Sequence, residues 1–483
     1  MQVYAFIETF VSERFERRVV MFMKTRKERD MLGEVSVPKD AYWGISTQRA
    51  TRNFKISGKR FPESFIIALA KVKKACVEAN LELGELDDHR AKAIMQAIDE
   101  LVDEGKYTDQ FPLDVFQTGS GTQTNMNMNE VLANRANEIL GHPLGTKFPV
   151  HPNDHVNKSQ SSNDVIPTTM HLTVLELLNT KLFPALNTLE ESLGRKINEF
   201  RGIVKVGRTH LQDAVPICLS TEFEVYRRQV ELSQLRLKDA CHELYLVPIE
   251  GTAVGTGVNA DKSFGKLAVS HLKNNTGFPF KPNPIKAEGI ASHNSIVKVS
   301  GELRLLALSV LKMANDIRLM GSGPRAGLGE LALPANEPGS SMMPGKVNPT
   351  QAEALAQVCL QVMGNDATIS LAEAFGSTLD LNVTKPLMIT NLLDSIELLA
   401  NGIHSFVQHC LNGLKTNMEH IKSQLERNLM VATNLVPIVG YDKASEIAQI
   451  AAKSGKTIKQ VILETKLEIK GDLDKLLDPK KMV

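Results

Sequence analysis

Cysteine is scarce in this chain of 483 residues, and its pattern excludes several kinds of site. The five cysteines form no C-x-x-C pair, and their number is odd. This pattern argues against a disulfide framework, a zinc site and an iron–sulfur cluster, and it favours buried thiols in a reducing compartment. The cysteines are Cys76, Cys218, Cys241, Cys359 and Cys410.

An excess of one charge and a long apolar run are also missing. Lys plus Arg number 56 and Asp plus Glu number 55, so the net charge is close to zero. We therefore expect neither nucleic acid nor an anionic membrane as a partner. No run has the length and apolarity of a transmembrane helix. The 42% hydrophobic content suits a globular protein with a large core, in which any attraction for an anion is local to a site.

Helical periodicity is the strongest pattern that the chain does contain. Apolar residues from Ile296 to Ile317 recur at alternating intervals of three and four, which predicts one long core helix. Leucines from Leu175 to Leu193 form a second stripe, and Pro184 should bend this helix without necessarily ending it. Residues 222–247 predict a third helix. Such stripes also occur in structural coiled coils, but the glycine-rich loops between them favour a globular protein.

The segment Gly339–Thr350, with the sequence GSSMMPGKVNPT, is the most informative part of the chain. Its adjacent serines offer hydroxyls and amides, and Lys346 offers a cation on a flexible stem. Asn348 and Pro349 predict the N-cap and the first residue of a helix, whose positive end would face the loop. This composition is typical of a mobile loop that binds an anion, although a run of this kind alone is more often an ordinary turn.

Two other segments repeat this design. Thr118–Asn125 precedes the apolar run Met126–Leu140, and Asn157–Asp164 precedes a second predicted helix. Each combines short hydrogen-bonding side chains with a helix start, where amides can point at a carboxylate or phosphate. The sequence therefore predicts that the three segments form the walls of one small-anion site.

These segments carry a resemblance to a known family. In order and spacing, five blocks resemble the signatures of the fumarase/aspartase superfamily, and the similarity runs from about Leu32 to Met482. Gly345, where aspartases usually carry alanine, is similar to the class II fumarases, with the aspartate ammonia-lyases as the alternative. The five blocks are Thr118–Arg135, His151–Asp164, Gly207–Pro216, Gly251–Asn259 and Gly339–Thr350.

The resemblance implies a mainly α fold. A central five-helix unit would join those of three other chains in a twenty-helix bundle, the core of a homotetramer, with smaller N- and C-terminal domains on each chain. We place an N-terminal lyase domain at residues 31–160, a central helical bundle domain at 161–417 and a C-terminal domain at 418–483.

Residues 1–30 lie outside the resemblance. Their basic and apolar residues fit a mitochondrial transit peptide, but five acidic residues argue against one, and a reading frame that starts too early is a further alternative. We expect a cytoplasmic enzyme with an uncertain leader over residues 1–30.

The implied reaction is the reversible, stereospecific hydration of fumarate to L-malate, without a metal or other cofactor. In the malate direction a base removes the C3 proton, and the resulting aci-carboxylate must be stabilised by preorganised donors and a cation. Aspartate ammonia-lyase activity is the alternative. A second alternative is a non-catalytic structural role, against which the intact catalytic positions speak.

The resemblance also implies a role for each matching residue. Ser340 would be the base, Lys346 and Asn348 would stabilise the intermediate, and His210 would position water while Glu353 sets its tautomer. A serine that only orders the loop is the alternative for Ser340. The substrate-binding positions are Ser120, Gly121, Thr122, Ser161, Ser162, Asn163, Thr209, Ser341 and Val347. A secondary anion site, for which a surface turn is the alternative, comprises His151, Pro152, Asn153 and Asp154.

Overall fold

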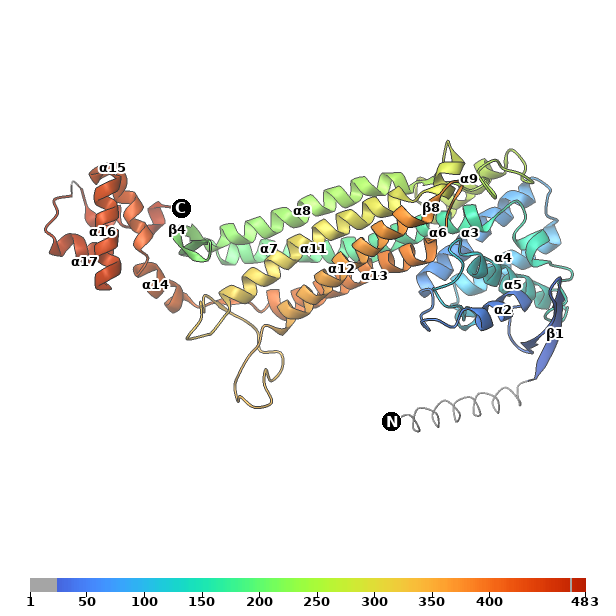
Figure 1. Ribbon diagram of the computed structural model, residues 1–483, viewed down its shortest axis with the longest axis horizontal. Helices are drawn as coiled ribbons and strands as arrows, with labels where there is room; N and C mark the ends of the chain where they lie inside the picture. The colour runs from blue at the N-terminus through green and yellow to red at the C-terminus, as the bar shows by residue number, and fades with distance from the viewer. Residues whose placement is uncertain (1–23, 470) are drawn as a thin grey trace. The chain divides into compact units, whose positions relative to one another are not determined.

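The computed structural model describes residues 24–469 and 471–483, and it is mainly α-helical, as predicted (Figure 1). Strands in the described part are short and pair into five two-stranded sheets. β1 (Thr25–Asp30) pairs antiparallel with β2 (Gly33–Pro38), with Thr25 opposite Pro38. Of the predicted leader, residues 1–23 lie outside the described residues, while residues 25–30 form β1 and belong to the fold.

The chain divides into two compact units, each built from separate stretches of sequence. The first unit comprises the described part of Met1–Leu178 together with Lys238–Gly301 and Asn365–Asp394. The second comprises Asn179–Leu237, Glu302–Gly364 and the described part of Ser395–Val483. The domain boundaries near residues 160 and 417 stay a prediction.

Helix α3 lies at the centre of the first unit. It packs against α4, α6 and α9, and its buried residues occupy most sides of the helix. A helix that is apolar on most sides is stable only when other helices surround it. The helices of this unit are α2 (Ile45–Asn53), α3 (Glu63–Glu82), α4 (Asp88–Val102), α5 (Thr122–Ile139), α6 (Ser162–Leu177), α9 (Phe264–Thr276) and α10 (Lys286–Ala291).

Four long helices begin in the residues of one unit and end in those of the other. They are α8 (Leu219–Leu244), α11 (Asn294–Met320), α12 (Thr350–Gly376) and α13 (Lys385–Phe406). The periodic stripe predicted from Ile296 to Ile317 lies on α11, and each of its seven apolar residues is at most 1% exposed. The prediction of a long core helix is therefore confirmed.

The leucine stripe around Pro184 runs through one helical stretch with a π turn inside it, in agreement with the prediction that the proline need not end the helix. α6 ends at Leu177, the π-helical turn η3 spans Leu178–Leu182, and α7 runs from Phe183 to Glu199. Pro184 follows closely after this turn, and since a proline inside a helix lacks the amide that bonds the preceding turn and its ring crowds that turn, the wider π turn accommodates it. The irregularity therefore precedes the proline and takes the form of a π turn.

Polar contacts join the long helices within each unit. In the second unit the Tyr226 hydroxyl of α8 donates to Asp316 of α11 over 3.0 Å. In the first unit the buried Ser300 hydroxyl of α11 donates to Asp366 of α12 over 2.7 Å. Buried hydrogen bonds of this kind fix the register of neighbouring helices, since a shift would leave a polar group without a partner.

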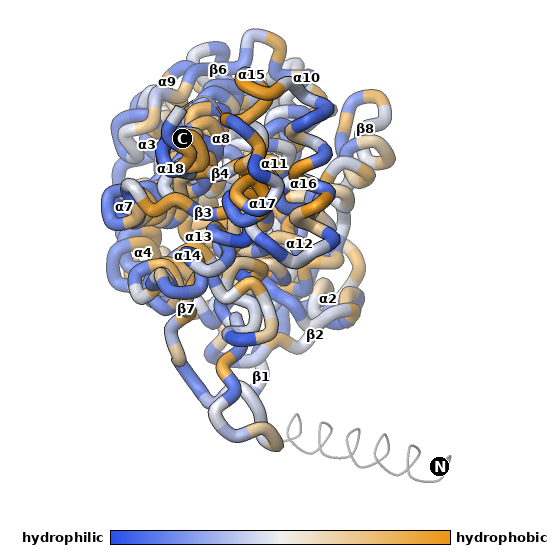
Figure 2. The backbone as a smooth tube through the Cα atoms, turned by 90° about the vertical axis from the view of Figure 1, so that its left-hand side faces the viewer, coloured by the Kyte–Doolittle hydropathy of each residue, from blue (hydrophilic) through white to orange (hydrophobic). Residues whose placement is uncertain are grey.

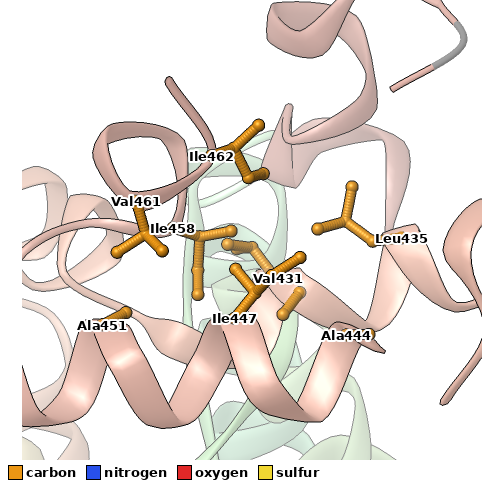
Figure 3. Close-up of a cluster of buried hydrophobic side chains, with 9 residues drawn as sticks. Val431, Leu435, Ala444, Ile447, Ala451, Ile458, Val461 and Ile462 are labelled. Atoms are coloured by element: carbon orange, nitrogen blue, oxygen red, sulfur yellow. The ribbon is translucent and has the colours of Figure 1, made fainter. Parts of the chain in front are cut away.

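The C-terminal residues build a small core of their own within the second unit. Side chains from η5 (Leu429–Leu435), α16 (Tyr441–Ser454) and α17 (Ile458–Glu464) point toward one another (Figure 3). Hydrophobic and hydrophilic residues alternate along these helices (Figure 2), as expected for helices with one buried face. The neighbouring helices are α14 (Met418–Glu426), α15 (Val436–Val439) and α18 (Leu473–Leu476).

The remaining elements are short. The strands are β3 (Val204–Thr209), β4 (Gln212–Cys218), β5 (Leu246–Val247), β6 (Lys281–Pro282), β7 (Leu331–Ala332), β8 (Ser377–Thr378), β9 (Leu381–Asn382) and β10 (Lys415–Thr416). The other helical turns are η1 (Thr108–Gln110), η2 (Pro152–Val156), η4 (Val407–Leu411) and η6 (Pro479–Lys481).

Candidate active site

The segment Thr118–Asn125 ends in a helix start without a side-chain cap. α5 begins at Thr122, four residues before the run Met126–Leu140 in which the sequence predicted a helix, and Gly121 precedes it with φ of +76°. Gly121 has no side chain to cap the helix, and Gln117 Oε1 accepts from the Thr124 amide over 3.1 Å, so the amides of Thr122 and Gln123 are the first-turn donors that can reach a ligand. Ser120 Oγ and Thr122 Oγ1 lie 2.7 Å apart, which places two hydroxyls beside the helix start.

The second predicted segment lies against the first. Asn125 Nδ2 donates to Ser162 Oγ over 3.0 Å and to Asn157 Oδ1 over 3.2 Å. The structure thus brings two of the three predicted segments together within the first unit. Their hydroxyls and amides form one polar surface at the starts of α5 and α6.

Asp164 ties this surface to a third loop. Its carboxylate accepts from the Ser161 amide over 2.9 Å and from the Thr252 amide over 2.8 Å. Asn163 Nδ2 donates to the Ala253 carbonyl over 2.8 Å. Burial raises the pKa of Asp164 to about 7, against the opposing effect of these amide donors. Ser161 is therefore held in a capping box at the start of α6.

Gly119 lies against a segment that the sequence did not connect with it. A Cβ at this position would lie 1.3 Å from the backbone oxygen of Val383, and Lys385 donates its amide to the Gly119 carbonyl over 3.0 Å. The connection between β9 and α13 therefore supports the Thr118–Asn125 segment. In the sequence, the only sign of this contact is the glycine itself, and a turn at this position would accept any small residue.

In the second unit, His210 lies at the tip of the β3–β4 hairpin. Thr209 pairs with Gln212, and the two residues between them, His210 and Leu211, have φ of +56° and +60°. Two-residue hairpin turns of this type favour Asn-Gly, so a His-Leu pair carries backbone strain. The sequence did not predict this turn. It exposes the imidazole to solvent beside the exposed Thr209.

Buried ion pairs hold the hairpin that carries His210. Arg208 Nη1 lies 2.6 Å from Glu330 Oε1, and Lys205 Nζ lies 3.1 Å from Glu330 Oε2. The Glu330 side chain is fully buried. The buried Glu330 carboxylate lies between two cations of β3 and so links this strand to β7 and its surroundings. The strained turn is therefore held by a rigid hairpin.

The Gly339–Thr350 loop closes on itself. The Gly339 amide donates to the Lys346 carbonyl over 2.9 Å, and the Asn348 side chain donates to the Gly339 carbonyl. The prediction that Asn348 caps the next helix is wrong by one position. α12 begins at Thr350, and the Pro349 carbonyl accepts the first helical bond, from the Glu353 amide over 3.0 Å.

Ser340 occupies a distinct position in this loop. Its Oγ accepts from the Met342 amide over 3.2 Å and from the Met343 amide over 3.0 Å. Two amide donors aimed at one hydroxyl oxygen favour negative charge on that oxygen.

Gly345 has φ of +77°, and a Cβ added to it would meet no atom within 4 Å. An alanine would meet no steric obstacle there, but its backbone would be strained. Gly345, the residue that distinguishes the class II pattern, therefore affects the loop through its backbone conformation.

The other predicted groups of the second unit point to solvent. Ser341, Lys346, Val347 and Glu353 are all exposed. Within the described part of the chain, the Lys346 ammonium has no ion-pair partner, and no hydrogen bond or ion pair joins His210 to Glu353. The predicted contact between His210 and Glu353 is therefore absent from the single chain.

The residues of the predicted secondary anion site form a folded turn. His151 Nδ1 accepts from the Asn153 and Asp154 amides, each over 3.2 Å, and Pro152 is buried. These contacts place the ring proton on Nε2. Because the two amides are already used, a ligand would have to bind the exposed side chains.

Two kinds of feature are absent from the described residues. No group of three or more His, Cys, Asp or Glu residues there could hold a metal ion. No helix in residues 24–469 and 471–483 is long and apolar enough to cross a bilayer. All five cysteines are free thiols, and all except Cys218 are buried, as predicted.

Known proteins similar to this chain point to one enzyme family. A family model described as "Lyase" matches residues 33–364, and one described as "Fumarase C C-terminus" matches residues 431–483. The chain is 51% identical to the class II fumarate hydratase of Thermosynechococcus vestitus, over 92% of this chain and 95% of the relative. It is 50% identical to that of Thermus thermophilus, over 95% and 98%.

Solved structures agree with these relatives. A crystal structure of recombinant class II fumarase from Schistosoma mansoni superposes with a TM-score of 0.92 at 38% identity. The match covers 95% of this chain and 99% of that chain. The similarity therefore extends over both units and the C-terminal residues.

Proposed function

The chain belongs to the lyase family of the class II fumarate hydratases, and from this premise we propose that the residues described above form its active site. It is a carbon–oxygen lyase that catalyses the reversible hydration of fumarate to L-malate. The aspartate ammonia-lyase alternative is not favoured, because the relatives at about half identity are fumarate hydratases.

We propose that the first unit binds the carboxylates of the substrate. The open amides at the start of α5 and the hydroxyls of Ser120 and Thr122 are donors suited to a carboxylate. Ser161, Ser162 and Asn163 add donors at the start of α6, beside Gly121. A dicarboxylate needs donors at both ends, and Lys346 and Asn348 with Thr209, Ser341 and Val347 would supply the second set.

Ser340 is proposed as the base that removes the C3 proton of malate. The observation that carries this assignment is the pair of amides donating to its Oγ. A serine hydroxyl is a weak base at neutral pH, so its alkoxide must be stabilised. The two amides do so, and Lys346, on the same loop, is proposed to add its charge and to stabilise the aci-carboxylate that forms.

His210 is proposed to position the water that adds to fumarate, with Glu353 setting its tautomer. The two side chains do not meet within one chain, so this pairing requires residues from different chains. We therefore propose that the active site is completed in a homotetramer.

Exposed apolar side chains on the long helices support that assembly. On α11 of the second unit, Leu305, Leu308 and Leu319 are 36%, 47% and 42% exposed and share one face. On α12, Leu360 is 59% exposed although the opposite side of the helix is buried. A helix that is apolar on all sides needs cover on all sides, which a second copy of the same bundle provides.

We further propose that the enzyme acts in the cytoplasm. The free state of all five cysteines supports a reducing compartment. A mitochondrial location would require the leader to act as a transit peptide, and its residues 1–23 lie outside the described part.

The test uses purified protein with fumarate or L-malate and no added metal. Ser340→Ala and His210→Asn should each lose most turnover while the assembly persists. Ser454→Ala, which removes an exposed hydroxyl of α16, should leave turnover unchanged. Full activity of Ser340→Ala would exclude it as the base, and no turnover by a folded wild-type tetramer would contradict the whole assignment.

A further inference from the structure

Lys73 is a buried cation beneath the proposed carboxylate-binding surface. It lies on α3 of the first unit and has a relative exposure of 0%. Its Nζ donates to Asn157 Oδ1 over 2.8 Å and to Gln160 Oε1 over 2.9 Å. Among the described residues no carboxylate lies within ion-pair distance of this Nζ, so its hydrogen-bond partners are neutral amides.

From Lys73, hydrogen bonds lead to both substrate segments. The same Asn157 Oδ1 accepts from Asn125 and Asn129, each over 3.2 Å, and Asn125 donates onward to Ser162 Oγ over 3.0 Å. The ammonium thus lies at the base of a network that joins the starts of α5 and α6. Because the side chain is fully buried, Lys73 cannot touch the substrate itself.

A buried cation of this kind lowers the stability of the fold if it serves only to hold the chain together. Burial lowers the pKa of Lys73 to about 7, since the charged form loses its water, and the charges of Cys76 and Asp164 oppose this effect. A cation in the protein interior without a charged partner destabilises the fold unless something else favours it. A bound dianion would favour it.

A neutral residue already anchors the turn at residues 157–160, which Lys73 also contacts. Asn80, two turns further along α3, donates to the Lys158 carbonyl over 3.0 Å and accepts from Ser159 Oγ over 2.9 Å. Anchoring the turn to α3 therefore does not require a charge. The net charge of +1 for the whole chain also gives no general attraction for a dianion, so the attraction must come from single residues near the site.

We propose that Lys73 is a positioning residue for the dicarboxylate substrate. Its ammonium orients Asn157, which through Asn125 sets the Ser162 hydroxyl, and its positive charge favours the dianion at that surface. This inference rests on the proposed function, because it assigns the polar surface of the first unit to the substrate carboxylates. Because the proposed role is in substrate binding, a substitution of Lys73 should change KM more than kcat.

The test compares substitutions at three buried or anchoring positions. Lys73→Met removes the charge at similar size, Asn80→Ala removes the neutral anchor, and Lys196→Met removes a buried lysine that bonds the Leu414 carbonyl in the second unit. For each, KM and kcat are measured with fumarate and with L-malate. Calorimetry measures the affinity for succinate, an unreactive four-carbon dicarboxylate, and the melting temperature reports stability.

Lys73→Met should raise KM and the succinate dissociation constant about tenfold or more, with a smaller effect on kcat, because a charged hydrogen-bond donor is lost. Lys73→Arg, which keeps the charge, should recover part of the affinity. Asn80→Ala and Lys196→Met should lower the melting temperature without a comparable change in KM.

Two results would overturn the proposal. One is an unchanged KM and succinate affinity in folded Lys73→Met; the other is an equal rise in KM for Asn80→Ala, which would reduce Lys73 to an anchor. If Lys73→Met does not fold, Lys73→Gln, which keeps a donor without the charge, decides the same comparison. Failure of the proposed function would show differently, as absence of turnover by the wild-type enzyme.

Discussion

Substitution of Gly119 by alanine tests how the substrate surface is supported. The added Cβ would lie 1.3 Å from the Val383 oxygen, 2.0 Å from its carbonyl carbon and 2.7 Å from its Cα. All three are backbone atoms, so no change of rotamer relieves the contact. Gly119 is not among the residues with positive φ, so an alanine there is strained only by this contact.

The contact distances set the size of the effect. Carbon atoms pack at about 3.5 Å or more, so the two segments must separate by roughly 2 Å. That separation breaks the hydrogen bond from Lys385 to Gly119 and shifts Ser120 and Thr122. Overpacking of this kind costs about 3 kcal/mol of stability. A misplacement of about 1 Å at a substrate-binding group lowers kcat/KM about a hundredfold.

The assay follows fumarate formation from L-malate, with the melting temperature and the assembly state measured on the same sample. The matched control is Gly194→Ala in α7, where the nearest atom to the new Cβ is a flexible arginine nitrogen at 3.8 Å. This control should gain up to about 1 kcal/mol of helix stability and keep its turnover. Wild-type kcat/KM in a folded Gly119→Ala tetramer would refute the argument that Val383 positions the substrate segment.

Three further changes test other parts of the structure. Hydrogen bonds from Arg135 hold the pKa of Glu100 at about 2, below the ordinary glutamate value of 4.5. Because the folded pKa is depressed, the Glu100 carboxylate stabilises the fold above about pH 4.5, and this contribution is lost as the pH falls toward 2. Glu100→Gln should therefore cost about 2 kcal/mol at neutral pH, and its difference from wild type in calorimetric melting should shrink over that acidic range. Ile447→Ala, at a side chain 2% exposed in the C-terminal core, should cost about 2 to 4 kcal/mol and speed amide exchange in α16 and α17 first. Leu360→Glu should shift the tetramer to smaller species in sedimentation velocity, whereas Leu463→Glu, 62% exposed in α17, should not; an unchanged tetramer would contradict the proposed interface.

Local patterns in the sequence indicated the helices and the approximate positions of their starts. The spacing of Ile296 to Ile317 predicted α11, and the polar clusters at residues 118–125, 157–164 and 339–350 indicated to within a few residues where α5, α6 and α12 begin. Periodicity and capping act between residues a few positions apart, so they leave a readable signature. The match to family signature blocks predicted the reaction for the same reason, since each block is a short contiguous run.

Other features depend on contacts that have no local signature. Nothing near Lys73 predicts that its ammonium reaches Asn157, and His210 with Leu211 occupies a turn that their own conformational preferences disfavour. The off-by-one start of α12 has the same origin, because Asn348 bonds Gly339 across the loop and not the helix beside it.

By itself, then, the sequence determined the family, the mainly α class, the long core helix and the residue types of the site. The sequence predicted that the segments around Asn125 and Ser162 converge, but only the tertiary structure decided which residues meet: Gly119 with Val383, Asn125 with Ser162, and Asp164 with Thr252. The physical reason is that helix formation is governed by neighbours in the chain. The placement of donors around a small anion depends instead on packing between residues far apart in sequence, where one backbone contact or one buried hydrogen bond selects the arrangement.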